Sequence, residues 1–385
     1  MTVPTVEPAL ESDRELADAA ERLGTPLFFY SLPALRAQIA RLRSSFSSYP
    51  IQMLFATMAN DRAEILRTIA SERVGACVNS LLHMRRAMKE GFSADKIHFT
   101  SCGLPVEDMQ YLQAMSIPAN LDSPLQIETW CRLKTGAVAG ARMNAASLNG
   151  SPAKSDRIGM SIPDFERSCD LARRLEGRVN GIHVYAGTNF QSANDMLRIL
   201  RGAFEIVRDH PELDYINIGG GIGIDYQHSG REFEYAYFGR EICAMAREVS
   251  EQRGNGLRVL FEPGRSLVGC SASFITRVTD IKDLDRSRFV VVDASVSVFP
   301  RPYHHPDTPH RARVLGAATS NGTRSIPSTV VGRTTFSRDI LGNYNLPEDL
   351  TVGSLLSFDD AGAYCESMMS RFLGQREPSC FVYEQ

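Results

Sequence analysis

Between about residues 50 and 265, short apolar runs alternate with longer stretches of helical periodicity. Stretches such as "RAEILRTIASE" repeat apolar residues every three to four positions, as an amphipathic helix does when one face is buried. The apolar runs are nearly continuous, which is typical of strands covered on both faces. Eight runs follow one another: 51–57, 74–79, 96–100, 117–122, 137–143, 181–186, 214–220 and 257–263.

Eight strand and helix units in succession predict an α/β fold, a (β/α)8 barrel over residues 30–265. A doubly wound open sheet would show the same alternation and is the alternative. After residue 265 the pattern changes to β-branched runs such as "RFVVVDASVSVF", without helices between them. This region predicts a mainly antiparallel β domain. The early run "PLFFYS" is expected to join it, so the second domain combines residues 1–29 with 266–385.

Composition and charge limit the kinds of molecule that the chain is expected to bind. A net charge of −3 gives no basic field for nucleic acid, and no apolar run approaches the ~18 residues of a membrane span. The N-terminus lacks a secretory apolar segment, and the eight cysteines have no zinc-like spacing. We therefore expect a cytoplasmic protein with reduced thiols, no metal site and a small-molecule ligand. Lysine is scarce, occurring only at 89, 96, 134, 154 and 282.

Candidate chemistry gathers where the predicted barrel strands end, the face on which such barrels carry function. Gly219, Gly220 and Gly221 follow the seventh strand, where backbone N–H groups can bind phosphate; a plain tight turn is the alternative. Glu262 and Arg265 flank Pro-Gly after the eighth strand. Arg265 could bind a phosphate while Glu262 binds a protonated ring nitrogen. The alternative is that the two side chains form an internal ion pair.

His183 ends an apolar strand and is interpreted either as a core residue or as a ring that stacks on a planar cofactor. Together these features resemble the fold-type III pyridoxal-phosphate decarboxylases, which include the ornithine and diaminopimelate decarboxylases. The resemblance runs from about residue 24 to the C-terminus. It is carried by "TPLFFYSLPALRAQI", "NLDSPLQIE", "HVYAGT", "INIGGGIG", "FEPGRSLV", "VVDASVSVFPRPYHH", "VVGRTTFSRD" and "DDAGAYCESM".

The resemblance implies pyridoxal 5′-phosphate as cofactor and a role for each matching residue. His183 would stack on the pyridine ring, and Glu262 would keep its nitrogen protonated so that the ring acts as an electron sink. The phosphate would be held by Gly219, Gly220, Gly221 and Arg265 and capped by Tyr364.

The family also implies substrate contacts and an assembly. Arg301 in "FPRPY" matches an arginine that binds a distal substrate carboxylate in diaminopimelate-type members. Asp339 in "FSRD" matches an acidic residue near the far end of the substrate, supplied by a second subunit. The chain is therefore expected to act on an amino acid or a derivative as a homodimer with shared sites.

The catalytic positions depart from this pattern. In "FATMAN" (55–60), Met58 stands where the family has the lysine that forms an imine with the cofactor, and a thioether forms none. Thr335 stands where the family has an acid–base cysteine, and a hydroxyl is a much poorer proton donor. Three further positions differ from the family: Cys77 for aspartate, His83 for glutamate, and Ala186 for a serine that Thr188 would replace.

Several interpretations follow from these departures. The chain is either an atypical decarboxylase-like enzyme that holds the cofactor without a covalent bond, a divergent enzyme with altered or no cofactor use, or a non-catalytic binding partner. A single substitution made to trap a substrate would leave the remaining positions intact, so changes at Cys77 and Thr335 argue against it. Lys154 is the best candidate among the lysines to replace the missing one.

Overall fold

The structure is a computed structural model that describes residues 12–148, 151, 157–285, 287–316 and 324–384. The chain separates into two compact units. One unit, the barrel unit, comprises Ile39–Ile224 and Glu232–Ser266. The other, the sheet unit, comprises Met1–Gln38, Asp225–Arg231 and Leu267–Gln385.

The barrel unit is a closed ring of eight strands in chain order. Every neighbouring pair is parallel, and the ring is closed by β2 and β9, where Ile51 pairs with Val259. This confirms the predicted (β/α)8 barrel and excludes the open sheet. The strands are β2 (Ile51–Ala56), β3 (Gly75–Val78), β4 (Ile97–Thr100), β5 (Ala119–Leu121), β6 (Val138–Met143), β7 (Arg178–Val184), β8 (Tyr215–Asn217) and β9 (Arg258–Phe261).

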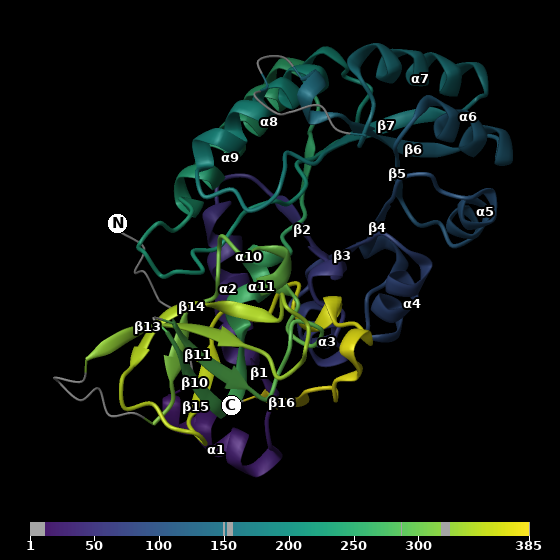
Figure 1. Cartoon of the computed structure of the whole chain (residues 1–385). Helices are drawn as coiled ribbons and strands as arrows, with labels where there is room; N and C mark the ends of the chain where they lie inside the picture. The colour runs from purple at the N-terminus through teal and green to yellow at the C-terminus, as the bar shows by residue number, and fades with distance from the viewer. Residues whose placement is uncertain (1–11, 149–150, 152–156, 286, 317–323, 385) are drawn as a thin grey trace. The chain divides into compact units, whose positions relative to one another are not determined.

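Helices cover the outside of this ring, as Figure 1 shows for α4 to α7. The longest apolar stripe belongs to α8, which has ten buried residues and an N-cap at Ser192. The helices of the barrel unit are α3 (Ala63–Ser71), α4 (Leu81–Lys89), α5 (Val106–Ala114), α6 (Pro124–Leu133), α7 (Ile162–Arg174), α8 (Ala193–Asp209) and α9 (Tyr235–Arg253). Two further helices, α2 (Leu32–Ser45) and the short α10 (Arg265–Val268), have residues in both units.

The barrel interior is unusually polar. Barrels of this kind are normally filled by branched aliphatic side chains. Here Tyr215 of β8 reaches across to Asn120 of β5, donating from its hydroxyl to Asn120 Oδ1 at 2.7 Å. Gly140 and Gly181 make this possible, because a Cβ at either position would lie 2.0–2.3 Å from Tyr215. The other buried polar side chains of the strands include His98, Thr100, His183 and Asn217.

The sheet unit is built on one mainly antiparallel sheet in the order β12-β15-β10-β11-β13-β14. The N-terminal strand β1 joins it by pairing with β10 and with β16. Phe274 and Phe299 stack at 4.3 Å in its aromatic core. Its elements are α1 (Asp13–Leu23), β1 (Leu27–Ser31), β10 (Ala272–Leu284), β11 (Ser287–Val292), α11 (Arg301–His304), β12 (Ala312–Val314), β13 (Ser325–Val331), β14 (Ile340–Pro347), β15 (Leu355–Phe358) and β16 (Ser379–Tyr383).

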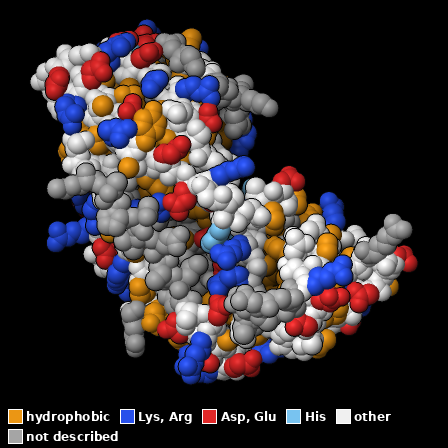
Figure 2. All heavy atoms as spheres, turned by 90° about the vertical axis from the view of Figure 1, so that its left-hand side faces the viewer, with side chains coloured by type: hydrophobic (Ala, Val, Ile, Leu, Met, Phe, Trp, Pro, Cys, Tyr) orange, Lys and Arg blue, Asp and Glu red, His pale blue; other side chains and the backbone are white. Residues whose placement is uncertain are grey.

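The surface carries both charge signs. On the face drawn in Figure 2, basic and acidic side chains are intermingled. Within the described ranges, every helix is too short or too polar to span a bilayer.

Candidate active site

Met58 occupies the middle of a 3-10 turn, Thr57–Ala59, directly after β2. The turn is held in place on both sides. Thr57 donates its hydroxyl to the carbonyl of Cys77 at 3.2 Å, and the amide of Arg62 donates to Asn60 Oδ1 at 3.0 Å. The half-buried Met58 is therefore presented at the carboxyl end of a barrel strand, the level at which such barrels carry their catalytic groups.

A buried polar cluster lies at the same level of the barrel. His183 Nε2 lies 3.1 Å from Glu262 Oε2, and Asn217 Nδ2 donates to Glu262 Oε1 at 2.7 Å. The cluster is closed to solvent, since Glu262 is 7% exposed and the other two residues are 2% and 0% exposed. The structure thus brings together the predicted His183 and Glu262, with Asn217 between their strands in register.

The environment keeps Glu262 ionised. Burial opposes ionisation, but the charge and hydrogen bond of His183 outweigh it, with help from Asn217 and Cys77, and lower the pKa of Glu262 to about 2. Burial, reinforced by the Glu262 charge, raises the pKa of the Cys77 thiol well above its ordinary value. The Cys77 thiol is therefore neutral, whereas an aspartate there would add a second negative charge to that of Glu262.

The glycine loop after β8 needs glycine for backbone packing. Gly219 and Gly221 have φ angles of +64° and +104°, and a Cβ on any of the three glycines would lie 2.2 Å from a backbone carbonyl oxygen. The loop is fixed by hydrogen bonds from the Glu262 amide to the Gly219 carbonyl and from Gly219 N–H to Asn217 Oδ1. In all three glycines, the side that would carry a Cβ faces the protein backbone.

Two buried polar atoms beside this cluster have no partner in the part of the chain that the structure describes. They are Arg142 Nε and His183 Nδ1, on residues that pair in register between β6 and β7. Arg142 Nη1 contacts Cys102 Sγ at 3.7 Å and lies 3.8 Å from Asp122 Oδ1. Buried orphaned polar atoms are expensive unless a ligand pairs with them. Arg265 is also buried and begins α10.

In the sheet unit, the two predicted substrate residues make internal contacts. Arg301 is 1% exposed; its two terminal nitrogens donate to the carbonyl and hydroxyl of Thr308, and its guanidinium lies 3.3 Å from the centre of the Tyr226 ring. Asp339 accepts from the Val296 amide at 2.8 Å and from the Thr334 hydroxyl at 2.5 Å. Both side chains therefore have structural partners within this unit.

Thr335 and Tyr364 also belong to the sheet unit. Thr335 is exposed on the segment after β13. Tyr364 is half-buried and adopts a φ of +56°, a conformation that non-glycine residues rarely take outside special sites.

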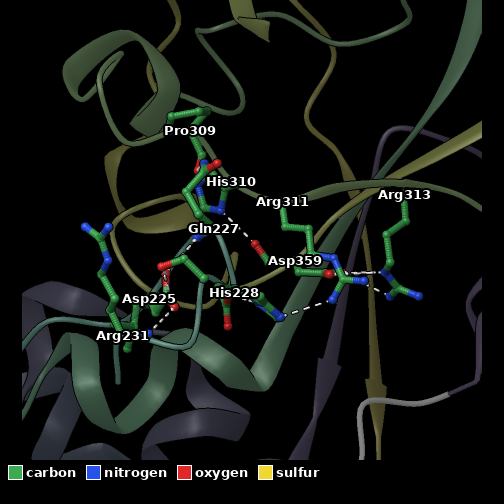
Figure 3. A network of polar contacts seen from close by, with 12 residues as sticks. Asp225, Gln227, His228, Arg231, Pro309, His310, Arg311, Arg313 and Asp359 are labelled. Carbon is green, nitrogen blue, oxygen red and sulfur yellow. Dashed lines mark hydrogen bonds and ion pairs between the residues drawn. The ribbon is translucent and has the colours of Figure 1, made fainter. Parts of the chain in front are cut away.

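A polar network fixes Asp225–Arg231 to residues 309–313 and Asp359–Asp360 within the sheet unit (Figure 3). His228 Nε2 lies 2.8 Å from Asp360 Oδ2, while Arg311 Nη1 lies 3.1 Å from Nδ1 of the same ring. The hydrogen bond to Asp360 raises the pKa of His228. Arg313 binds both oxygens of Asp359. In sequence this segment follows Gly223 by a single residue.

Sequence reasoning did not assign roles to Asn217, Thr100, Asn120 or Tyr215. Asn217 lies two residues before the glycine loop. It could have been identified from the sequence, because a polar residue inside "YINIGG" interrupts an apolar strand. The other three lie on different strands, so that only the closed barrel brings them together.

Comparison with known proteins decides the family. Residues 32–269 match the family described as "Pyridoxal-dependent decarboxylase, pyridoxal binding domain". The chain belongs to the pyridoxal-dependent decarboxylases. It is 27% identical to the probable chloroplastic diaminopimelate decarboxylase of Oryza sativa subsp. japonica, over 94% of this chain and 76% of that protein. It is 25% identical to the diaminopimelate decarboxylase of Methanothermobacter thermautotrophicus, over 95% and 88%.

Solved decarboxylase structures share the fold. The diaminopimelate decarboxylase of Helicobacter pylori complexed with L-lysine has a TM-score of 0.85 at 22% identity, covering 96% of this chain and 94% of that one. The lysine/ornithine decarboxylase of Vibrio vulnificus complexed with putrescine has a TM-score of 0.83 at 18% identity, covering 96% and 98%.

Pyridoxal phosphate is the cofactor of this family, and the barrel residues fit it except at one point. The ionised Glu262 suits a protonated ring nitrogen, and the unpartnered nitrogens of Arg142 and His183 suit a polar ligand beside it. Among the described residues, no lysine lies at the carboxyl ends of the strands. Lys89, Lys96 and Lys134 lie near the amino ends of the strands, opposite Met58, and Lys282 is on β10 of the other unit. Lys154 lies outside the described residues.

Proposed function

We propose that this chain binds pyridoxal phosphate without a covalent bond and acts as an atypical amino-acid decarboxylase. The observation that carries the proposal is the buried, ionised Glu262 paired with His183 at the carboxyl ends of a barrel of this family. When bound, pyridoxal phosphate supplies an electron sink for the carbanion that loss of CO2 leaves on an amino acid.

The residues of the chain take the following roles in this proposal. Glu262 accepts a hydrogen bond from the protonated ring nitrogen, and His183 and Asn217 hold the carboxylate in place. Gly219, Gly220, Gly221 and Arg265 would bind the phosphate. Met58 excludes water at the strand end and takes no part in proton transfer, since a thioether neither donates nor accepts a proton near neutral pH.

The substrate in this proposal is an amino acid or an amino-acid derivative, as the names of the relatives suggest for their own reactions. Arg301 and Asp339 are the candidate substrate residues, within a homodimer that shares its sites. Their internal partners imply that either residue would exchange a local contact for a substrate contact. Turnover is expected to be slow, because one missing acid–base group typically costs about 10²–10⁴-fold.

Equilibrium titration with pyridoxal phosphate, followed by borohydride treatment and intact-mass measurement, tests the proposal. We expect saturable binding, with no mass added by reduction. Met58→Lys is expected to add the mass of one reduced cofactor, whereas Met88→Lys, a half-buried position on α4, is not. Absence of binding to both the native chain and Met58→Lys would overturn the cofactor proposal.

A second candidate function is that of a non-catalytic binding protein. Met58 and the exposed Thr335 favour it, because the two positions that carry proton transfer in the family have both lost their chemistry. Release of CO2 from an amino acid by the native chain, abolished in Glu262→Gln, would exclude this candidate.

A further inference from the structure

A second pocket opens at the mouth of the barrel opposite Met58, where the strands begin. Its volume is about 320 Å³, at the lower end of the range for small-molecule sites. Tyr215 and Arg258, the first residues of β8 and β9, line it together with His98 of β4 and Trp130 of α6. None of the residues proposed to hold pyridoxal phosphate lines this pocket, so it is a separate site of the barrel unit.

The Tyr215 ring forms a fixed wall of this pocket. Its hydroxyl is held by Asn120, and the ring lies where a Cβ at Gly140 or Gly181 would otherwise be. Two polar groups pack against the same ring. The imidazole of His98 meets it edge to face with 6.0 Å between ring centres, and the guanidinium carbon of Arg258 lies 5.6 Å from its centre. Tyr215 therefore places a histidine and an arginine at one pocket.

His98 contributes a buried polar atom that lacks a partner. Its Nδ1 makes no hydrogen bond to any described residue, although the side chain is only 4% exposed. Burial lowers the pKa of His98 to about 4, so the ring is neutral near pH 7 and has one N–H to donate. A buried nitrogen of this kind is costly unless a ligand or a water molecule pairs with it, and the pocket provides the space for such a partner.

The charge of the lining favours an anion. Two cationic side chains, Arg258 and Lys134, line the pocket against a single carboxylate, that of Asp95. Asp95 is also shared with Lys96, whose Nζ lies 3.9 Å from Asp95 Oδ2. The lining is therefore positive overall. An arginine guanidinium binds a carboxylate through two parallel hydrogen bonds, which gives this site a preferred ligand group.

We propose that the pocket at the amino ends of the strands binds a small monocarboxylate with an apolar body. The carboxylate pairs with the guanidinium of Arg258 and accepts a hydrogen bond from Nδ1 of His98, so that the ring proton resides on that nitrogen in the complex. The apolar body lies against Ile117, Ala119 and Trp130 of the same lining. This site goes beyond the proposed function and needs no pyridoxal phosphate.

Benzoate is the probe that tests the proposal on the full chain without pyridoxal phosphate, and benzamide is its neutral counterpart of the same shape. Isothermal titration calorimetry measures both. We expect saturable binding of benzoate at one site and binding of benzamide that is weaker by about tenfold or more, since its hydrogen bonds carry no charge. If benzoate does not bind, or if the two probes bind equally, the proposal is wrong. Failure of the chain to bind pyridoxal phosphate would leave this measurement unchanged.

Three arginine variants locate the bound carboxylate. Arg258→Gln should weaken benzoate binding by about tenfold or more, because it removes the paired charge. Arg132→Gln is the matched control, since Arg132 is an exposed arginine of α6 that does not line the pocket. Arg142→Gln removes a cation at the carboxyl end of β6 and should leave the affinity unchanged. Loss of affinity in Arg142→Gln but not in Arg258→Gln would place benzoate at the other mouth and overturn the proposal, as would equal losses in Arg258→Gln and Arg132→Gln.

The imidazole ¹⁵N resonances of His98 report its part in the site. They are assigned by their loss in His98→Phe, which keeps a ring against Tyr215. Saturating benzoate should shift the neutral ring toward the form protonated on Nδ1, whereas benzamide at the same concentration should shift it less. Resonances that benzoate leaves unchanged would overturn the proposal. If His98→Phe does not fold, the affinity of Arg258→Gln carries the test, because Arg258 is exposed and its replacement leaves the interior intact.

Discussion

The imidazole of His183 and the carboxylate of Glu262 form a buried pair across 3.1 Å, although 79 residues separate them in the chain. Strands β7 and β9 bring them together from either side of β8, whose Asn217 bonds the same carboxylate. A buried pair of this kind stabilises little by its presence and costs much when one partner is removed.

Glu262→Gln should therefore lower the free energy of unfolding by about 3–5 kcal/mol, because it leaves His183 without its charged partner. Glu128→Gln, which disrupts an exposed pair with Arg132 on α6, is the control and should cost under about 0.5 kcal/mol. Urea unfolding of both variants measures the difference. Equal losses would show that the buried pair contributes no more than the surface pair.

The same substitution should change the acid stability. The pKa of Glu262 is lowered from 4.5 to about 2 in the folded chain. Its stabilisation is thus fully present above pH 4.5 and is lost as the pH falls toward 2. Glu262→Gln should show a shallower decrease of the unfolding free energy between these values. Parallel pH profiles of the two proteins would contradict this prediction.

Cys77→Asp restores the family residue and should be harmful on its own. Two carboxylates would then share the barrel interior, and like charges in contact raise the pKa of one of them. We expect a loss of about 1–3 kcal/mol at neutral pH that becomes smaller on acidification, as protonation relieves the repulsion. Cys77→Asn, which is similar in shape and uncharged, separates charge from size; a loss equal to that of Cys77→Asp would rule out repulsion as the cause.

Gly221→Ala tests why the loop after β8 consists of glycines. A Cβ there would lie 2.2 Å from the Gly187 carbonyl oxygen at a φ of +104°. Gly230→Ala is matched in having a positive φ, +79°, with open space around it. We expect the control to lose about 1–2 kcal/mol and Gly221→Ala to lose more, measured by thermal unfolding. The same loss at both positions would mean that the loop accommodates the Cβ.

Asp339→Asn distinguishes the internal role of this residue from its proposed substrate role. Asp339 accepts hydrogen bonds from Val296 and Thr334, and Gly332 lacks the Cβ that would meet its carboxylate. An internal role predicts a stability loss of about 1–3 kcal/mol, against under about 0.5 kcal/mol for the exposed Asp349→Asn. Unchanged stability with a raised KM for the amino-acid substrate would instead support the substrate role.

The barrel could be predicted from the sequence because its signal is local. Each strand is a short apolar run, and each helix repeats its apolar residues along one face. Every strand and helix unit can therefore be recognised within about 30 residues. The ends of the predicted strands also indicated His183 and Glu262 as candidate residues, and the structure places the two side chains in contact.

Partners inside the barrel could not be predicted in this way. Burial of Thr100 or Asn120 is visible in the pattern, but the residue each one bonds depends on ring closure and on the space left by Gly140 and Gly181. The contacts of the glycine loop could not be predicted either. Its position suggested an anion site, while its composition is also required by carbonyl oxygens of distant segments.

Strand β16 has a protective role that follows from its pairing. It runs parallel to β1, with Leu27 opposite Ser379, and covers one side of a strand whose five residues are all buried. A chain truncated before Ser379 would expose the apolar "LFFYS" as an open sheet edge, which other copies could extend strand by strand. In the native chain, β16 keeps this edge of β1 paired.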